Sequence, residues 1–221
     1  MSRKDTKKLP QTPFLYPILD SAFSKDLHED ARALLEAGIE IFQIRAKDWS
    51  KRKIFDAVIE LLPECNRKNA RMIINDYVDV TLLSYAHGVH LGQDDFAVGD
   101  ARLLLPQAII GISSHNDFQF SVANSQPVDY IAIGPIYPTR TKIGSTDLAL
   151  GVEFVRNVCK SARVPVVCIG GIGIQHFDAL IKAGAKGIAL ISSLYKDGDV
   201  YRTARQMREH LGSLQKSDEK I

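Results

Sequence analysis

The sequence predicts an α/β fold, a single-domain (β/α)8 TIM barrel, and three observations lead to this prediction. Short apolar runs rich in β-branched residues alternate with longer amphipathic segments along the chain. About eight such pairs are present, which is the number that closes a parallel sheet into a barrel. The chain has 221 residues, and barrels of this kind commonly form one domain of about 200–250 residues. With fewer units, an open doubly wound sheet is the structural alternative.

The predicted strands are short apolar runs that end in glycine or in polar residues. They cover residues 14–20, 39–45, 71–76, 88–92, 108–114, 130–134, 165–171 and 187–192. The predicted helices lie between them, near residues 25–37, 50–62, 78–86, 99–105, 117–125, 150–161, 175–183 and 199–212. Strands that alternate with helices in this way indicate successive right-handed βαβ units.

Helix-ending and helix-starting residues support these divisions. Gly38 and Gly184 each follow a periodic segment and precede an apolar run, and glycine readily adopts the left-handed turn that ends a helix. Ser50 is a suitable N-cap for the next helix. Residues 1–12 and 214–221 are polar and aperiodic, so we expect a catalytic domain at 13–213 with a flexible tail on each side.

The composition is that of an ordinary globular protein and argues against several function classes. The formal net charge is only +2, and without a concentrated basic stripe no nucleic-acid partner is expected. No run approaches the roughly 18 continuous apolar residues of a membrane span, so no membrane partner is expected. Three widely spaced cysteines, Cys65, Cys159 and Cys168, form no metal-ligand pattern and suit a reducing, cytoplasmic setting.

Polar residues gather where the predicted strands end. A parallel barrel brings the carboxyl ends of its strands to one rim, so these residues are expected to surround one pocket. Gln43, Arg45 and Lys47 occupy every second position and therefore point to one face of an extended strand. Ile39 and Ile41 share their parity, which places that face inside the barrel.

The alternate residues of this strand, Phe42 and Ile44, are then expected to face the surrounding helices. A solvated strand end is the alternative interpretation. It is disfavoured because Arg45 lies above packed apolar layers, where it requires a counter-charge.

Two further strand ends carry carboxylates. Asn75-Asp76 alone is more typical of a turn or a helix cap, but Gln93–Asp95 follows the next strand. Two carboxylates at neighbouring strand ends can hold one Mg²⁺ and leave positions for phosphate oxygens and water. Asp95 is the better ligand candidate than Asp94, although their spacing does not separate them.

The later strand ends supply donors for phosphate groups. Segment 134–142 carries hydroxyls and a lysine after a Gly-Pro strand exit, and we expect a lid over the substrate there. For Arg140 an exposed loop position is the favoured interpretation. Gly170-Gly171 and residues 191–193 follow predicted strands seven and eight, where barrels of this class frequently bind phosphate through backbone N–H groups.

The histidines near the rim carry weaker signals. Ser113 and His115 lie at one strand end, but their nearness in sequence does not establish a hydrolytic triad. His90 is expected to pack at its strand end. His115 is undecided between packing and ligand contact.

Together these blocks resemble the thiamine phosphate synthase family, and the similarity runs from about residue 14 to near residue 210. The matching blocks, in order, are QIRAK (43–47), NDYVD (75–79), HLGQDD (90–95), GISSH (111–115), GPIYPTRTK (134–142), IGGI (169–172) and ISS (191–193). Their order and combination are far more specific than any one block. The resemblance implies a barrel that joins hydroxymethylpyrimidine diphosphate to hydroxyethylthiazole phosphate with Mg²⁺. Tyr77, which replaces a basic residue, and the loop 143–150 depart from the family pattern.

The resemblance also implies roles for individual residues. The predicted metal ligands are Asp76 and Asp95. The predicted catalytic residues are Arg45, Lys47, Ser113 and Lys142. The predicted substrate-binding residues are Gln43, Arg45, Lys47, Asn75, Ser113, Thr139, Thr141, Lys142, Gly171, Ile191 and Ser192. A homodimer is expected on the same ground.

Three other functions remain open on the sequence alone. A related barrel can tautomerise thiazole phosphate, or bind a phosphate ligand as a noncatalytic regulator. Either needs no complete metal–diphosphate site, so the combination of Asp76, Asp95, Lys47 and Lys142 favours the synthase. A sugar-phosphate isomerase requires a clear general acid/base pair, and the sequence shows none.

Overall fold

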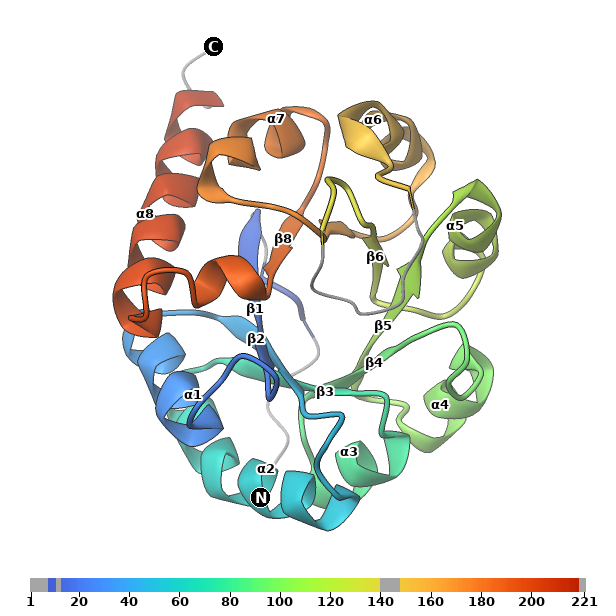
Figure 1. Ribbon diagram of the computed structural model, residues 1–221. Helices are drawn as coiled ribbons and strands as arrows, with labels where there is room; N and C mark the ends of the chain where they lie inside the picture. The colour runs from blue at the N-terminus through green and yellow to red at the C-terminus, as the bar shows by residue number, and fades with distance from the viewer. Residues whose placement is uncertain (1–7, 11–12, 140–147, 219–221) are drawn as a thin grey trace.

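The computed structural model describes residues 8–10, 13–139 and 148–218, and it confirms the closed barrel. The eight strands pair in chain order, all in parallel, and β8 closes the sheet onto β1. Figure 1 looks onto the barrel and shows the helices as a ring around it. The strands are β1 (Phe14–Asp20), β2 (Ile41–Arg45), β3 (Arg71–Asn75), β4 (Gly88–Leu91), β5 (Ile109–Ser114), β6 (Tyr130–Ile133), β7 (Val166–Cys168) and β8 (Gly187–Leu190).

An α-helix follows each strand, and a short 3-10 helix precedes each of the last two α-helices. The α-helices are α1 (Leu27–Glu36), α2 (Lys51–Arg67), α3 (Val78–Ser84), α4 (Val98–Leu104), α5 (Asp117–Asn124), α6 (Gly151–Ser161), α7 (Phe177–Lys182) and α8 (Val200–Asp218). The 3-10 helices are η1 (Ile174–His176) and η2 (Ser192–Leu194). None of the helices in the described ranges is both long and apolar enough to cross a membrane.

The helix boundaries follow from local chemistry. Ser50 caps α2 by accepting a hydrogen bond from the Lys53 N–H, as predicted. Gly38 and Gly184 adopt positive φ angles of 76° and 105° and end α1 and α7. The predicted end of α2 at residue 62 is wrong, because the helix continues through Pro63.

Other predicted boundaries also differ from the structure, and β7 ends at Cys168 where the prediction extended it to Gly171. The strand predicted from residue 39 begins at Ile41, since the Ile39 N–H donates to the Leu34 carbonyl and completes the turn that ends α1. Ile39 consequently packs outside the barrel, so of the two isoleucines only Ile41 has the predicted inward orientation. The last helix runs to Asp218, beyond the predicted limit of 212. The division of the chain into a domain with two tails stays a prediction.

The core has two parts, divided by the sheet. Ten buried residues fill the barrel interior: Phe14, Tyr16, Ile18, Ile41, Ile73, Ile109, Tyr130, Ala132, Val167 and Ala189. A larger apolar cluster lies between the strands and the helices and includes Phe42 and Ile44, which confirms their predicted orientation. The alternation of strand side chains separates the two parts.

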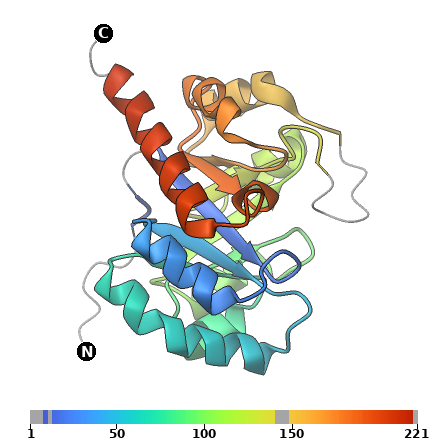
Figure 2. The same ribbon diagram turned by 60° about the vertical axis from the view of Figure 1, so that its left-hand side comes forward.

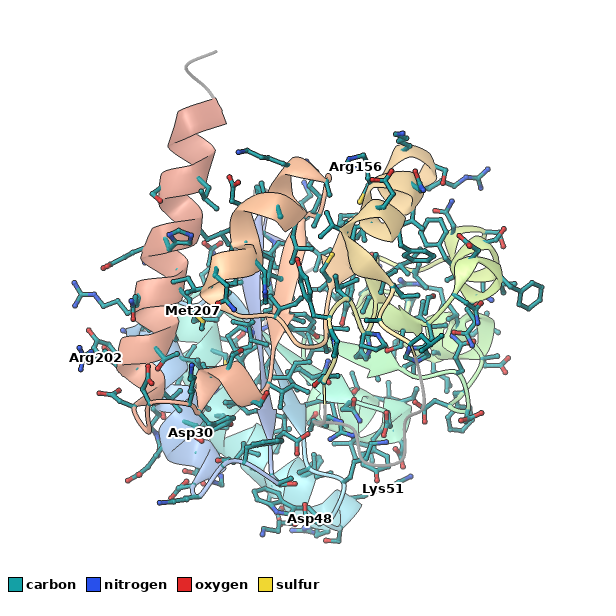
Figure 3. The ribbon with its side chains drawn as sticks, turned by 45° about the horizontal axis from the view of Figure 1, so that its top comes forward. Asp30, Asp48, Lys51, Arg156, Arg202 and Met207 are labelled. Atoms are coloured by element: carbon teal, nitrogen blue, oxygen red, sulfur yellow. The ribbon has the colours of Figure 1, made fainter. Side chains whose placement is uncertain are left out.

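The last helix completes the outer ring. Figure 2 shows α8 beside α1, so helices from the two ends of the chain pack together across the seam between β8 and β1. Figure 3 shows Met207 on the side of α8 that faces the barrel and Arg202 on the outer side of this helix. Met207 is buried and Arg202 is exposed, as an amphipathic helix on a barrel requires.

Candidate functional site

One cavity of about 570 Å³ opens at the carboxyl ends of the strands. Every predicted site residue that the structure describes lines it: Gln43, Arg45, Lys47, Asn75, Asp76, Asp95, Ser113, Thr139, Gly171, Ile191 and Ser192. Arg140, Thr141 and Lys142, the last three residues of the predicted lid, lie outside the described residues. The barrel therefore brings the described members of the set together, while their chemical roles remain predictions.

Arg45 has the buried counter-charge that its position requires. Its guanidinium forms a salt bridge with Asp20, at the end of β1. The Asp20 side chain is only 4% exposed, and its other carboxylate oxygen accepts a hydrogen bond of 2.9 Å from the Ala22 N–H. Asp20 is not among the predicted site residues, although it shares the inward parity of Ile18. This pairing holds Arg45 at the cavity wall.

An acidic pair with one lysine forms the second part of the site. Lys47 Nζ lies 3.4 Å from the Asp76 carboxylate. Asp76 and Asp95 lie within side-chain hydrogen-bonding reach of each other. Burial raises the pKa of the Asp76 carboxyl above its ordinary value, and the neighbouring Asp95 raises it further, while Lys47 opposes the shift.

Backbone geometry holds both carboxylates in place. Asp76 has a left-handed φ of 66°, and its N–H donates to the His90 carbonyl on β4. The Asp95 carboxylate accepts a hydrogen bond of 2.6 Å from the Gly92 N–H, whereas Asp94 is more exposed. This difference favours Asp95 as the ligand.

The donor set suits a hard cation that keeps open coordination positions. Across residues 8–10, 13–139 and 148–218, no three His, Cys, Asp or Glu side chains gather into a metal-binding group. Two adjacent carboxylates repel each other when both are ionised, and a divalent cation relieves that repulsion. The residues present therefore fit Mg²⁺, which commonly uses one or two carboxylates and substrate phosphate.

The floor of the cavity is polar and buried. Gln43 is 1% exposed, and its Nε2 donates to the Tyr16 hydroxyl at 3.0 Å. His90 is 8% exposed, and both its ring nitrogens have partners, the Tyr130 hydroxyl at 2.8 Å and the Ser113 hydroxyl at 2.9 Å. His90 packs at its strand end as expected, but it also contacts a predicted catalytic side chain.

His115 lines the cavity while one of its nitrogens bonds the backbone. Its Nδ1 donates to the Gly134 carbonyl at 2.7 Å. Its backbone N–H donates to the Gln119 side chain. These bonds fix the ring between β5 and the exit from β6.

The paired glycines after β7 are required by packing. A Cβ at Gly171 would lie 2.6 Å from the Pro138 carbonyl oxygen, and one at Gly170 would lie 2.6 Å from Pro135 Cα. Their φ angles of 66° and 95° are also unfavourable for other residues. The bare backbone lets the loops after β6 and β7 meet at the cavity edge.

The comparisons with known proteins agree on one family. The family model described as thiamine monophosphate synthase matches residues 15–194. The chain is 34% identical to the thiamine-phosphate synthase of Persephonella marina, over 88% of this chain and 93% of that protein. It is 35% identical to the thiamine-phosphate synthase of Chloroflexus aurantiacus, over 88% of this chain and 90% of that protein.

A solved structure gives the same result. The thiamine phosphate pyrophosphorylase of Pyrococcus furiosus superimposes with a TM-score of 0.83 at 29% identity. The alignment covers 91% of this chain and 96% of that one. The likeness therefore extends over the whole barrel, including the rim that carries the cavity.

Proposed function

This chain belongs to the thiamine monophosphate synthase family, and from that premise we propose that it is a transferase that joins hydroxymethylpyrimidine diphosphate to hydroxyethylthiazole phosphate. The products are thiamine phosphate and diphosphate. The observation that carries the proposal is the convergence of Asp76, Asp95, Lys47 and Arg45 on one cavity. A diphosphate leaving group needs this combination of cations and metal-binding carboxylates.

The reaction is a substitution at the pyrimidine methylene carbon. The C–O bond to the diphosphate breaks, its electron pair leaves with the diphosphate, and the thiazole nitrogen forms the new C–N bond. The electron-rich aminopyrimidine stabilises positive charge at that carbon, so the protein need not supply a nucleophile. The task of the site is to hold the two substrates and to stabilise negative charge on the departing group.

Each side chain has a distinct part in that task. Asp76 and Asp95 would hold Mg²⁺, which, when bound, neutralises charge on the diphosphate oxygens. Arg45 is held by Asp20 with donors remaining for the substrate, because a guanidinium carries five N–H groups. Lys47, whose side chain is 59% exposed, lines the same cavity and supplies a second cation.

The loops after β7 and β8 are proposed to bind the monophosphate of the thiazole substrate. Gly171, Ile191 and Ser192 line this side of the cavity. The glycine backbone permits close approach of an anion to its N–H groups. Thr139 lies at the same edge, and Thr141 and Lys142 are proposed to act with it.

The direct test is synthesis of thiamine phosphate by the purified protein. Both precursors and Mg²⁺ are supplied, the product is measured by chromatography, and a chelator is added in parallel. We expect product only with the metal. A protein that consumes neither precursor under these conditions would contradict the proposal, and conversion of the thiazole phosphate alone would indicate a tautomerase.

A pair of variants tests the metal assignment. We expect Asp95→Asn to lower kcat by roughly 100-fold or more, by analogy with the loss of one preorganised electrostatic group. Asp94→Asn should lower it far less, since Asp94 is the more exposed of the two. The reverse order of effects would move the metal ligand to Asp94.

The cellular location and oligomeric state are also proposed rather than observed. A cytoplasmic enzyme agrees with three free thiols, of which Cys65 and Cys168 are buried. A homodimer follows from the family resemblance. Light scattering of the purified protein tests the second point directly.

A further inference from the structure

Five side chains from five strands form one continuous hydrogen-bonded chain across the barrel interior. Gln43 Nε2 donates to the Tyr16 hydroxyl at 3.0 Å, and the Tyr16 and Tyr130 hydroxyls lie 2.7 Å apart. The Tyr130 hydroxyl lies 2.8 Å from His90 Nδ1, and His90 Nε2 lies 2.9 Å from the Ser113 hydroxyl. The chain begins and ends at residues that line the cavity, while both phenols lie buried beneath it.

The fold makes specific room for the middle of this chain. Gly111 on β5 faces the Tyr130 ring, and a Cβ there would lie 2.0 Å from Tyr130 Cζ and 2.4 Å from its hydroxyl oxygen. Tyr16 meets Tyr130 edge to face at 88°, and His90 stacks on Tyr130 at 19°. These contacts fix the three rings relative to one another.

The three rings of this hydrogen-bonded series, Tyr16, Tyr130 and His90, are neutral. Burial raises the pKa of both Tyr16 and Tyr130, so each phenol keeps its hydrogen. His90 is buried, and both of its ring nitrogens face neutral hydroxyls and no carboxylate, so the neutral imidazole is favoured. Each phenol therefore has one hydrogen to donate, and the neutral imidazole has one donating and one accepting nitrogen.

All of these hydrogens can form hydrogen bonds only if every donor in the series from Gln43 to Ser113 points in the same direction. With Gln43 Nε2 donating to Tyr16, the Tyr16 hydrogen goes to Tyr130 and the Tyr130 hydrogen goes to His90 Nδ1. His90 then carries its hydrogen on Nε2 and donates it to Ser113. The opposite direction requires Oε1 and Nε2 of Gln43 to exchange places. Ser113 would then donate its hydrogen to His90 and have none for a ligand.

We propose that this chain is a positioning relay that fixes His90 as the Nε2–H tautomer and directs the Ser113 hydroxyl hydrogen into the cavity. This inference rests on the proposed function, with Ser113, one of the predicted catalytic and substrate-binding residues, contacting the diphosphate. A diphosphate offers only acceptors, so Ser113 serves it as a donor. The same direction leaves Gln43 Oε1 as an acceptor for an amino group such as that of the pyrimidine.

The two substrate contacts are coupled by this arrangement. Turning the amide at one end reverses every hydroxyl between it and the serine, so the acceptor and the donor are set together. Successive hydrogen bonds in one direction also polarise one another in a low-dielectric interior. Tyr16, Tyr130 and His90 are positioning residues in this scheme, because they act through Gln43 and Ser113.

Nuclear magnetic resonance of the ¹⁵N-labelled imidazoles tests the direction without any substrate. Two histidines serve as internal references: His87 Nδ1 accepts from the Met72 N–H, which fixes an Nε2–H tautomer, and His115 Nδ1 donates to the Gly134 carbonyl, which fixes the opposite one. We expect the His90 nitrogens to match those of His87 near pH 7. A match to His115 would overturn the relay.

Assignment and kinetics complete the experiment. The His90 signals are the ones absent from the His90→Gln variant, or those displaced in Tyr130→Phe. We expect Tyr130→Phe to lower kcat roughly tenfold, the worth of one aligned hydrogen bond, with KM for the thiazole phosphate little changed. Tyr201→Phe is the matched control, since that phenol lies exposed on α8.

Rescue separates positioning from simple packing. His90→Gln retains an amide N–H for Ser113, so it should keep more of kcat than His90→Leu. Equal kcat values for these two variants would refute the relay. Thiamine phosphate formation with His90 in the other tautomer would reject the relay alone, whereas the expected tautomer without product would reject the proposed function alone.

Discussion

Neutralising Asp20 is predicted to weaken both the fold and the site, because this carboxylate holds Arg45. In Asp20→Asn the remaining oxygen can still accept from the Ala22 N–H, so the change removes the charge and little volume. Loss of one partner of a fully buried ion pair costs about 3–5 kcal/mol. Arg45 is 22% exposed at the cavity and can be partly hydrated, which reduces that cost.

The expected loss is therefore that of one hydrogen bond to a charged group, about 1.5–3 kcal/mol of unfolding free energy. For a chain of this size the loss corresponds to a fall in Tm of roughly 3–12 °C. The freed guanidinium also loses its fixed position, so kcat/KM for the pyrimidine diphosphate should fall roughly 10- to 100-fold. Thermal unfolding and steady-state kinetics measure the two effects.

Asp56→Asn supplies the matched control. It removes the carboxylate of an exposed ion pair with Arg52 on α2, whose side chains are 54% and 82% exposed, and no measurable change in Tm is expected. If Asp20→Asn leaves Tm and kcat/KM at the values of that control, the argument that Asp20 fixes Arg45 is wrong.

Three further predictions concern packing, pH and the acidic pair. Gly111→Ala should destabilise the protein by at least about 1–3 kcal/mol through overpacking, whereas Gly99→Ala, with open space around its Cβ in α4, should stabilise it by about 0.5–1 kcal/mol in chemical denaturation. Burial lowers the pKa of His87 from 6.5 to about 4, so the unfolded chain binds its proton first and stability is lost as pH falls from about 6.5 towards 4. His87→Asn should remove about 2 kcal/mol of the stability difference between pH 7.5 and pH 5, and an unchanged pH slope would refute that attribution. Asp76→Asn should raise Tm or leave it unchanged without metal, because it relieves repulsion from Asp95, and should abolish the rise in Tm that Mg²⁺ produces in the wild type. A wild-type rise in Tm with Mg²⁺ that persists in this variant would remove Asp76 from the metal site.

Much of the candidate site could be predicted because strand ends in a parallel barrel share one rim. Gln43, Arg45, Asp76 and Asp95 each follow an apolar run, and that local pattern was enough to place them around one cavity. The need of Arg45 for a counter-charge also followed from the sequence, since a charge above apolar layers requires a partner.

The identity of that partner did not follow. Asp20 and Arg45 are brought together by the register of β1 on β2, in which the two residues are directly paired. The position of a residue along a strand tells which face its side chain occupies. A one-residue change of register would, however, place a different residue of the neighbouring strand beside each side chain. A helix-ending turn likewise removed Ile39 from its predicted strand.

The sequence by itself determined the alternation of strands and helices, the caps and the set of residues at the rim, since these depend on local periodicity and backbone preference. Only the tertiary structure decided the contacts across the barrel, such as Tyr16 with Tyr130 and His90 with Ser113. These contacts depend on stagger and on space left by a neighbour, as Gly111 leaves it for Tyr130. Closure of the sheet fixes both quantities at once, and no single segment of the chain contains them.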